Sequence, residues 1–237
     1  MNKCLLTCIL FFSIANELYA EHTILGTNSV FTSGEYEIIS DIEVSNLKIR
    51  HVRQIDSKLC VKSSQHDDHI EMDGPINPDT PFIIERLLRI IEESPNRCTS
   101  PEDGRPFAVS VYMNSGGGYM EDGYALGRIL RREFAKTRIA YNGECYSSCA
   151  AAFIGGGYRS MGKESKLMFH APYSYSSRYD ISCNRKDNKL LNYMKEMLNE
   201  TDGKFLYERT MSYCSRSSGW TLNKDAAEIF GLINSNE

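Results

Sequence analysis

One serine and one histidine stand where they could act together as a nucleophile and its base. Ser147 lies in a turn with small residues, Gly143 to Cys149, where a predicted strand passes into a helix. His170 ends the next predicted strand. A histidine beside a serine hydroxyl can take its proton and activate it for acyl transfer. The N–H of Ser148, the following residue, could then stabilise the oxyanion of the intermediate.

A second turn could supply another oxyanion donor. Phe107 to Met113 is apolar and β-branched, as in a buried strand, and Gly116 to Gly118 precede a helical pattern that begins at Tyr119. Glycine lets N–H groups face outward at a helix start, where they can hold a phosphate or an oxyanion. The Gly118 amide is the candidate donor. Two non-catalytic interpretations stay open: a tight packing turn, and a buried histidine satisfied by hydrogen bonds.

The elements that must position these residues alternate between strands and helices. The pattern predicts a helix over Tyr119 to Lys136, a strand over Arg138 to Asn142, a buried apolar stretch over Ala150 to Ile154, and a strand over Lys166 to His170. Parallel strands joined by right-handed crossovers bring strand ends to one edge, where α/β sites form. The predicted class is α/β.

The flanking segments carry no chemistry that the sequence identifies. Residues 21–65 are short extended pieces, which predicts a small β-rich N-terminal layer. The other expected elements are a strand over Ile70 to Ile76, a helix capped by Asp79 or Thr80 and ended by Pro95, a helical stretch over Asp187 to Met211 broken near Gly203, and a short helix capped by Asn223.

Composition and the first residues bound the function class. The chain has 237 residues, 41% of them hydrophobic, and a net charge of −4 without a basic stripe, which argues against nucleic-acid binding. Residues 1–20 carry one lysine, an apolar run and a small residue before the expected cut, as in a signal peptide. No later stretch could span a bilayer. We therefore expect an exported protein, periplasmic or secreted.

Two groups of residues have the side-chain types that metals prefer. Removal of the signal peptide leaves six cysteines, which in an oxidising compartment are expected to form disulfides, with about fifteen possible pairings. These are Cys60, Cys98, Cys145, Cys149, Cys183 and Cys214. Their spacing matches no zinc motif well. The run His66 to His69 has ligand types as well, but four polar residues between strands favour a solvated loop. No metal or cofactor is expected.

Four motifs in order resemble the Clp protease proteolytic subunit. Asn114 to Gly118 is similar to its Asn-Ser-Pro-Gly-Gly turn, and Gly143 to Ser147 falls where that family has Gly-x-x-x-Ser. Lys166 to Pro172 resembles its Met-Ile-His-Gln-Pro strand, and Ala226 to Ile233 its closing Glu-Ala-x-x-Tyr-Gly-Leu-Ile segment. The resemblance covers roughly residues 70–234. The cysteines around the serine look more like predicted exported Clp-like proteins of bacteria.

The resemblance implies a crotonase-type spiral of ββα units over residues 66–237 and members that often assemble as rings. It implies Ser147 as the nucleophile, His170 as the general base, and the amides of Gly118 and Ser148 as the oxyanion hole. Ser148 is the second candidate for the nucleophile, because two adjacent serines leave the register open by one residue.

The chain departs from the family pattern at two positions. Gly116 replaces the proline of the family turn, and the position of the triad aspartate falls at or near Gly219, where no acid stands. Loss of the orienting acid can lower turnover about 10⁴-fold. Three acids could substitute for it, and two lysines could form a Ser–Lys dyad instead. The acids are Asp180, Asp202 and Glu208, and the lysines are Lys195 and Lys204.

The sequence thus predicts an exported serine hydrolase, a peptidase that acts on peptides or unfolded proteins and is a possible homo-oligomer. An ATP-driven unfoldase is not expected as its partner, because ATP is not expected outside the cytoplasm. The alternative is a catalytically impaired binding or scaffold protein on the same fold, which the missing aspartate favours. A third possibility, crotonase-type chemistry on an acyl thioester, requires coenzyme A, which is not expected in that compartment.

Overall fold

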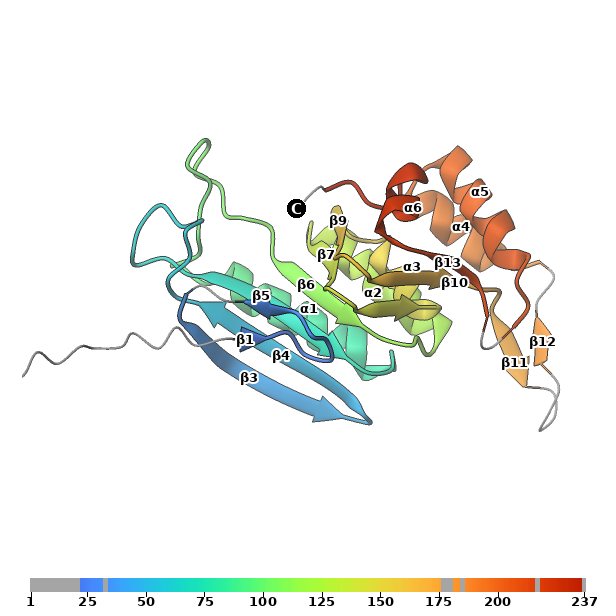
Figure 1. Ribbon diagram of the computed structural model, residues 1–237, viewed down its shortest axis with the longest axis horizontal. Coiled ribbons are helices and arrows are strands. Elements are labelled where there is room, and N and C mark those ends of the chain that lie inside the picture. The colour runs from blue at the N-terminus through green and yellow to red at the C-terminus, as the bar shows by residue number, and fades with distance from the viewer. Residues whose placement is uncertain (1–21, 32–33, 176–180, 184–185, 216–217, 236–237) are drawn as a thin grey trace, which may run out of the picture.

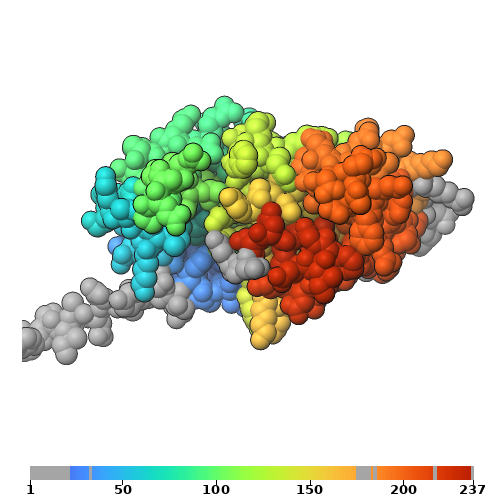
Figure 2. Space-filling model, turned by 90° about the horizontal axis from the view of Figure 1, so that it is seen from above, coloured from blue at the N-terminus to red at the C-terminus, as the bar shows by residue number. Residues whose placement is uncertain are grey.

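The computed structural model describes residues 22–31, 34–175, 181–183, 186–215 and 218–235. The predicted signal peptide, residues 1–20, and one of the candidate acids, Asp180, lie outside the described residues. The described part is elongated, with the N-terminal strands at one end and helices α4 (Asn188–Met197) and α5 (Glu200–Met211) at the other (Figures 1 and 2). None of its helices is long and apolar enough to cross a membrane.

A six-stranded sheet forms the larger part of the fold. Its order is β3-β4-β5-β6-β7-β9, antiparallel from β3 to β5 and parallel from β5 onward. The strands are β3 (Tyr36–Val44), β4 (Leu47–Gln54), β5 (Asp67–Asp73), β6 (Ser110–Asn114), β7 (Lys136–Ile139) and β9 (Tyr158–Met161). The N-terminal segment is β-rich as expected. It is not a separate layer, however, because β4 pairs with β5 along its length and so extends this sheet.

A smaller sheet carries the ends at which the candidate serine and histidine stand. Its order is β13-β10-β8, with β10 parallel to β8 and antiparallel to β13. A bridge between Ser115 and Cys145 links it to the end of β6. Two short antiparallel pairs, β1 with β2 and β11 with β12, lie outside both sheets. The strands are β1 (His22–Thr23), β2 (Val30–Phe31), β8 (Glu144–Tyr146), β10 (Lys166–Phe169), β11 (Tyr173–Tyr175), β12 (Ile181–Cys183) and β13 (Trp220–Leu222).

Apolar helix faces close the core against the sheets. The remaining helices are α1 (Asp79–Glu92), α2 (Met120–Arg132), α3 (Ser148–Phe153) and α6 (Lys224–Ile229). In α1 the residues at helical spacing, Ile84, Leu88 and Ile91, are buried as predicted. α3 is short and entirely buried, which agrees with its uncharged sequence.

The helix caps are partly as predicted. Asn223 caps α6, because its side chain accepts the N–H of Ala226 at 2.9 Å. The predicted cap of α1 is wrong. Asn77 precedes the helix, and its Oδ1 accepts the N–H groups of Asp79 (3.0 Å) and Thr80 (3.2 Å). An Asx turn at Asn77 therefore leads into this helix, which begins at Asp79.

Two predicted helix boundaries are also wrong. The helical stretch over 187–211 breaks between Met197 and Glu200, not near Gly203, because Asn199 caps α5. Gly203 lies inside α5, where a Cβ would approach the backbone of Lys195 to 2.5 Å, so this glycine permits close helix packing. The preceding long helix, α2, ends at Arg132, since Phe134 takes a left-handed φ of 49° and leads into β7.

The run His66 to His69 is not the solvated loop that its polarity suggested. Asp67 begins β5, and both Asp68 and His69 are buried. Partners from elsewhere in the chain make this burial possible: His51 lies 3.2 Å and Arg53 3.0 Å from the Asp68 carboxylate. A buried carboxylate is tolerated when it is paired and hydrogen-bonded, and the pairing holds its pKa down at about 2 despite the opposing effect of burial.

All six cysteines after the predicted signal peptide are joined in disulfides, which agrees with the expectation of export. The pairs are Cys60–Cys98, Cys145–Cys149 and Cys183–Cys214. Cys145 lies in β8 and Cys149 in α3, so only one of them is helical, as a bridge across this short spacing requires.

Candidate active site

Ser147 occupies a strained turn between β8 and α3. Its φ of 58° and ψ of −120° are rare for a residue with a side chain. The same kind of sharp strand-to-helix turn exposes the nucleophile of α/β-hydrolases. Hydrogen bonds fix it on both sides: its N–H donates to the Met168 carbonyl at 2.9 Å, and its own carbonyl accepts from Ala151 at 3.1 Å. The surrounding structure thus maintains an unfavourable conformation that presents one side chain.

The glycine turn after β6 lies directly against this serine. A Cβ on Gly117 would approach the Ser147 Cβ and the Tyr146 carbonyl to 2.8 Å, and the φ of Gly117 is +99°. A Cβ on Gly118 would lie 2.0 Å from the carbonyl of Ile76. Ile76 holds the turn by donating to Gly117 (3.0 Å) and accepting from Tyr119 (3.1 Å). Gly117 and Gly118 must therefore be glycines, because neighbouring atoms leave no space for a side chain at either position.

The two predicted oxyanion donors keep free N–H groups. Gly118 lies before α2, and Ser148 is the first residue of α3, so neither amide has an intrahelical acceptor. Within the described part of the chain, neither donates to another acceptor. Gly117 brings the turn up to Ser147 and the Ser148 nitrogen, so both amides remain candidates for stabilising a developing negative charge.

The adjacent serines are distinguished by burial. Ser148 is 0% exposed, and its Oγ has no hydrogen-bond partner among the described residues. Gly123 of α2 packs so closely against Ser148 that no side chain would fit at position 123. Ser147, by contrast, lines the cavity described below. The geometry favours Ser147 as the candidate nucleophile.

His170 follows β10, which runs parallel to β8 with Met168 opposite Tyr146. Ser147 and His170 therefore stand at the same edge of the smaller sheet, as predicted. The histidine is 5% exposed, and its ring stacks on that of Tyr173, with centroids 5.5 Å apart. Its Nδ1 lies 3.0 Å from the Ala171 carbonyl. Because a carbonyl only accepts, Nδ1 carries the proton, and Nε2 is left as the acceptor in the neutral ring.

An open cavity of about 970 Å³ joins these residues. Its lining comprises Gly116, Gly117, Gly118, Tyr119, Met120, Tyr146, Ser147, Lys166, Met168, His170, Pro172, Tyr173 and Thr221. No hydrogen bond joins Ser147 to His170, although both are described residues and both line the cavity. Such bonds are often long without substrate and tighten in the complex.

The sequence did not single out Lys166 and Tyr146 at this cavity. Lys166 begins β10, and His170 follows that strand four positions later, so the two-residue period of an extended chain was the signal that could place them on one face. The Lys166 ammonium pairs with Glu144 at 3.2 Å. Burial, followed by the hydrogen bond with Glu144, raises the pKa of Tyr146, which keeps its phenol protonated as a donor.

No described carboxylate orients His170. A Cβ on Gly219 would lie 2.5 Å from the Phe169 carbonyl, which leaves no room for an acidic side chain. Asp202 instead accepts from Asn199 at 2.7 Å, and Glu208 lies 4.0 Å from Lys204. Neither acid lines the cavity. The structure thus fails to bring these two substitutes to the site, and the Ala171 carbonyl holds the ring in their place.

The two lysines considered for a Ser–Lys dyad also lie elsewhere. Lys195 pairs with Glu200 at 2.6 Å, and Lys204 lies on α5. The lining of the cavity includes neither of them. The lysine that does reach the cavity is Lys166, whose ammonium is engaged by Glu144. His170 is therefore the candidate base.

The glycine turn supports a prediction with an internal control. Gly117→Ala is expected to lower the free energy of unfolding by about 1–3 kcal/mol, because its φ is positive and its space is filled. It should also lower hydrolysis at least about tenfold by displacing Ser147. Gly116→Ala has open space and should change stability by less than about 0.5 kcal/mol. Urea unfolding and peptide hydrolysis of both variants test this, and equal effects would contradict it.

Comparisons with known proteins give a fold relationship. No protein-family model matches the chain, and no curated protein matches it. Two solved structures of the 1510-N membrane-bound stomatin-specific protease are similar to it at 16% identity over 68% of this chain. One is a serine-to-alanine mutant (74% of that chain, TM-score 0.51). The other is a lysine-to-alanine mutant in complex with a substrate peptide (70%, TM-score 0.50). The chain therefore shares the α/β fold of these two structures.

Proposed function

We propose that this protein is an exported serine hydrolase that cleaves peptide bonds, with Ser147 as the nucleophile and His170 as the base. The observation that carries the proposal is that one cavity holds a serine in a strained turn, a histidine with its Nε2 free to accept, and the Gly118 turn. The fold shared with a protease supports it. The three disulfides support the exported location.

The reaction follows from these positions. The Ser147 Oγ attacks the scissile carbonyl carbon while its proton passes to His170 Nε2. The carbonyl oxygen becomes an oxyanion, which accepts hydrogen bonds from the amides of Gly118 and Ser148. The imidazolium then gives its proton to the leaving amine. A water molecule, deprotonated by the same nitrogen, releases the acyl group and restores the serine.

The Ala171 carbonyl takes the place of the triad aspartate in this mechanism. It accepts from Nδ1 and so selects the tautomer in which Nε2 is the base. A neutral carbonyl stabilises the imidazolium less than a carboxylate does, because it carries no net charge. The N–H of Ala171 is held by the Tyr213 carbonyl at 2.9 Å, which fixes the segment. Slower turnover than that of a complete triad follows.

The substrate is an extended peptide or an unfolded protein. The cavity is open and bordered by Tyr119, Met120 and Tyr173, apolar and aromatic groups that suit peptide side chains. Export removes the protein from cytosolic ATP, so no ATP-driven unfoldase prepares the substrate, and folded proteins are poor substrates. Assembly into a homo-oligomer, and a spiral of ββα units as the repeat, belong to this proposal by analogy with Clp-type proteins.

A binding or scaffold function is the second candidate. Two observations favour it: Gly219 leaves no space for the orienting acid, and no hydrogen bond joins Ser147 to His170 among the described residues. In that case the cavity would hold a peptide without cleaving it. The comparison of wild type with His170→Ala, described next, separates the hydrolase from the binding function.

The test of the base compares wild type with His170→Ala on an unfolded, fluorescently labelled protein and on its folded form. Cleavage of the unfolded form should fall at least about 10³-fold in the variant, because the serine loses its proton acceptor. Undiminished cleavage by His170→Ala would contradict the proposal. Absence of cleavage by wild type, together with saturable peptide binding that Ser147→Ala retains, would establish the binding function instead.

A further inference from the structure

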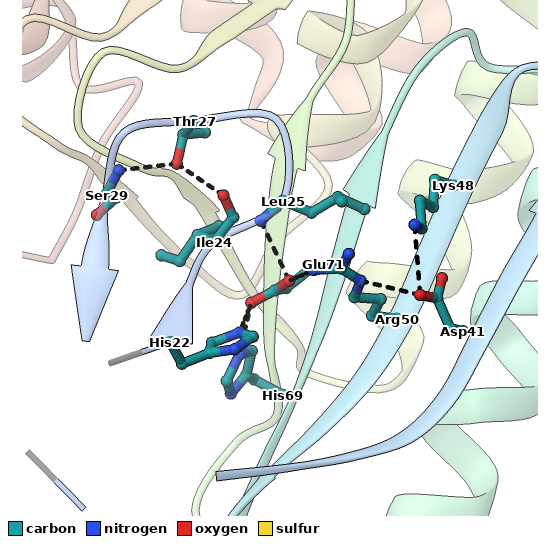
Figure 3. Close-up of polar contacts among 10 residues, drawn as sticks. All are labelled: His22, Ile24, Leu25, Thr27, Ser29, Asp41, Lys48, Arg50, His69 and Glu71. Atoms are coloured by element: carbon teal, nitrogen blue, oxygen red, sulfur yellow. Dashed lines mark hydrogen bonds and ion pairs between the residues drawn. The ribbon is translucent and has the colours of Figure 1, made fainter. Parts of the chain in front are cut away.

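A second cluster of reactive side chains lies on the opposite side of the large sheet from α1, far from the candidate active site in sequence. His69 and Glu71 stand two positions apart on β5, so both side chains point to the same face. His22 of β1 comes to this face from the beginning of the described chain (Figure 3). Glu71 is 0% exposed, and both histidines are buried.

The donor atoms of these three residues converge on one point. His22 Nε2 lies 2.6 Å and His69 Nε2 3.1 Å from the same oxygen of Glu71, Oε1. All three atoms lie within 4.8 Å of one another. Ligands of a tetrahedral zinc ion at about 2.0–2.2 Å are about 3.3 Å apart. A shift of less than about 1 Å would therefore admit an ion between the three donors.

The second oxygen of Glu71 is held by other groups, as in many metal sites. Leu25 N–H donates to Oε2 at 3.2 Å, and the Arg50 guanidinium lies 4.0 Å from it (Figure 3). These contacts fix the carboxylate so that Oε1 faces the imidazoles. They also leave Glu71 only Oε1 with which to bind an ion. The positive charge of Arg50 nearby limits how much further positive charge the site can hold.

Aromatic rings surround the imidazoles. His22 packs on both Phe31 and Tyr36, with centroids 6.2 and 5.4 Å away, and His69 packs on Phe31 and Tyr112 at 5.4 and 5.3 Å. Such rings limit side-chain motion and exclude water from a metal centre. Thiolates of the described residues do not compete for the ion, because all six cysteines there are in disulfides.

We propose that His22, His69 and Glu71 bind one divalent transition-metal ion, with zinc as the ion that this ligand set fits. Two imidazoles and one carboxylate are an established zinc donor set, with a water molecule as the fourth ligand. The proposal differs from the expectation from the sequence that no metal is bound. The ion attaches β1 to β5. That attachment also secures Gly26, whose carbonyl accepts from Asn114 (2.9 Å) at the start of the glycine turn.

The test is zinc titration of the disulfide-bonded full chain, purified without a polyhistidine tag and monitored by calorimetry. One zinc ion per chain is expected, with micromolar or tighter affinity. His22→Ala and Glu71→Gln should each weaken it at least about tenfold. His22 lies in a two-residue strand, so its replacement leaves the sheets intact. Co²⁺ in place of zinc should show the visible absorption of a four-coordinate ion in wild type and lose it in both variants.

His66→Gln is the matched control. His66 is another histidine beside a buried carboxylate, 3.1 Å from Asp68, but it belongs to a different cluster. Its variant should bind zinc as wild type does. The proposal is overturned if wild type binds no zinc at one ion per chain, if His22→Ala and Glu71→Gln bind it as tightly as wild type, or if only His66→Gln loses it. Magnesium should give no signal, because it prefers oxygen ligands.

Discussion

Ser147→Ala is expected to lower peptide hydrolysis at least about 10³-fold, since the attacking oxygen is removed and only binding and the oxyanion amides remain. The free energy of unfolding should change by less than about 0.5 kcal/mol, because this side chain lines a cavity and makes no side-chain hydrogen bond within the described residues. Initial rates on a fluorogenic peptide and urea unfolding measure the two effects separately.

Ser148→Ala is the control for this experiment, because it removes a neighbouring hydroxyl that points into the protein. Its Oγ is buried and has no hydrogen-bond partner in the described part of the chain, a condition that costs about 1–3 kcal/mol. The variant should therefore be at least as stable as wild type and should keep its hydrolytic rate within a few fold. Loss of activity in Ser148→Ala with activity retained in Ser147→Ala would show that the nucleophile is assigned to the wrong serine.

The disulfide Cys145–Cys149 is expected to matter more for activity than for stability. It joins β8 to α3 on either side of Ser147 and closes a loop with a sequence separation of only 4. Removal of a bridge that closes so short a loop lowers the free energy of unfolding by about 2 kcal/mol in the chain-entropy account. Because the bridge helps to hold the strained turn, replacing both cysteines by alanine should lower hydrolysis at least about tenfold.

The disulfide Cys183–Cys214 provides the opposite case. Its sequence separation is 31, so its loss should cost about 4 kcal/mol, about twice as much. It lines no part of the cavity, and the double alanine variant should hydrolyse peptide at a rate close to that of wild type while it is folded. Urea unfolding and rates measured well below the transition test both. A Cys145/Cys149 variant with full activity would contradict the role of that bridge in the turn.

The main features of the candidate site could be predicted because they depend on local pattern. A serine after a turn of small residues and a histidine at a strand end need only a parallel pairing of β8 and β10 to meet, and that pairing is present. Glycines mark close backbone approaches, and Gly117 and Gly118 occupy two of them. The apolar spacing in α1 likewise identified its buried face.

The features that were missed depend on contacts between distant residues. Polarity suggested a loop at His66 to His69, but partners such as His51 and Arg53 bury this run in a strand. The partner of Glu71, His22, lies 49 residues away in the sequence, so no local pattern could connect them. The hydrogen bond from His170 to a backbone carbonyl leaves no mark in the sequence at all.

The predicted helix break is wrong for a related reason. The sequence predicts a helix break near Gly203, whereas this glycine lets α5 approach the backbone of Lys195 in the neighbouring helix. The true break is set by Asn199, whose side chain caps α5. Glycine and asparagine both punctuate helices, and only the packing between helices decides which of them ends one.

Covalent labelling with a fluorophosphonate probe, followed by peptide mapping, tests the central claim most directly, because the probe reacts with an activated serine whatever the natural substrate is. The account predicts one label per chain, on Ser147, that is retained in Ser148→Ala and lost in Ser147→Ala and His170→Ala. Folded, disulfide-bonded protein that takes up no label, or label that persists when Ser147 is replaced, would contradict the assignment of this cavity as a serine hydrolase site.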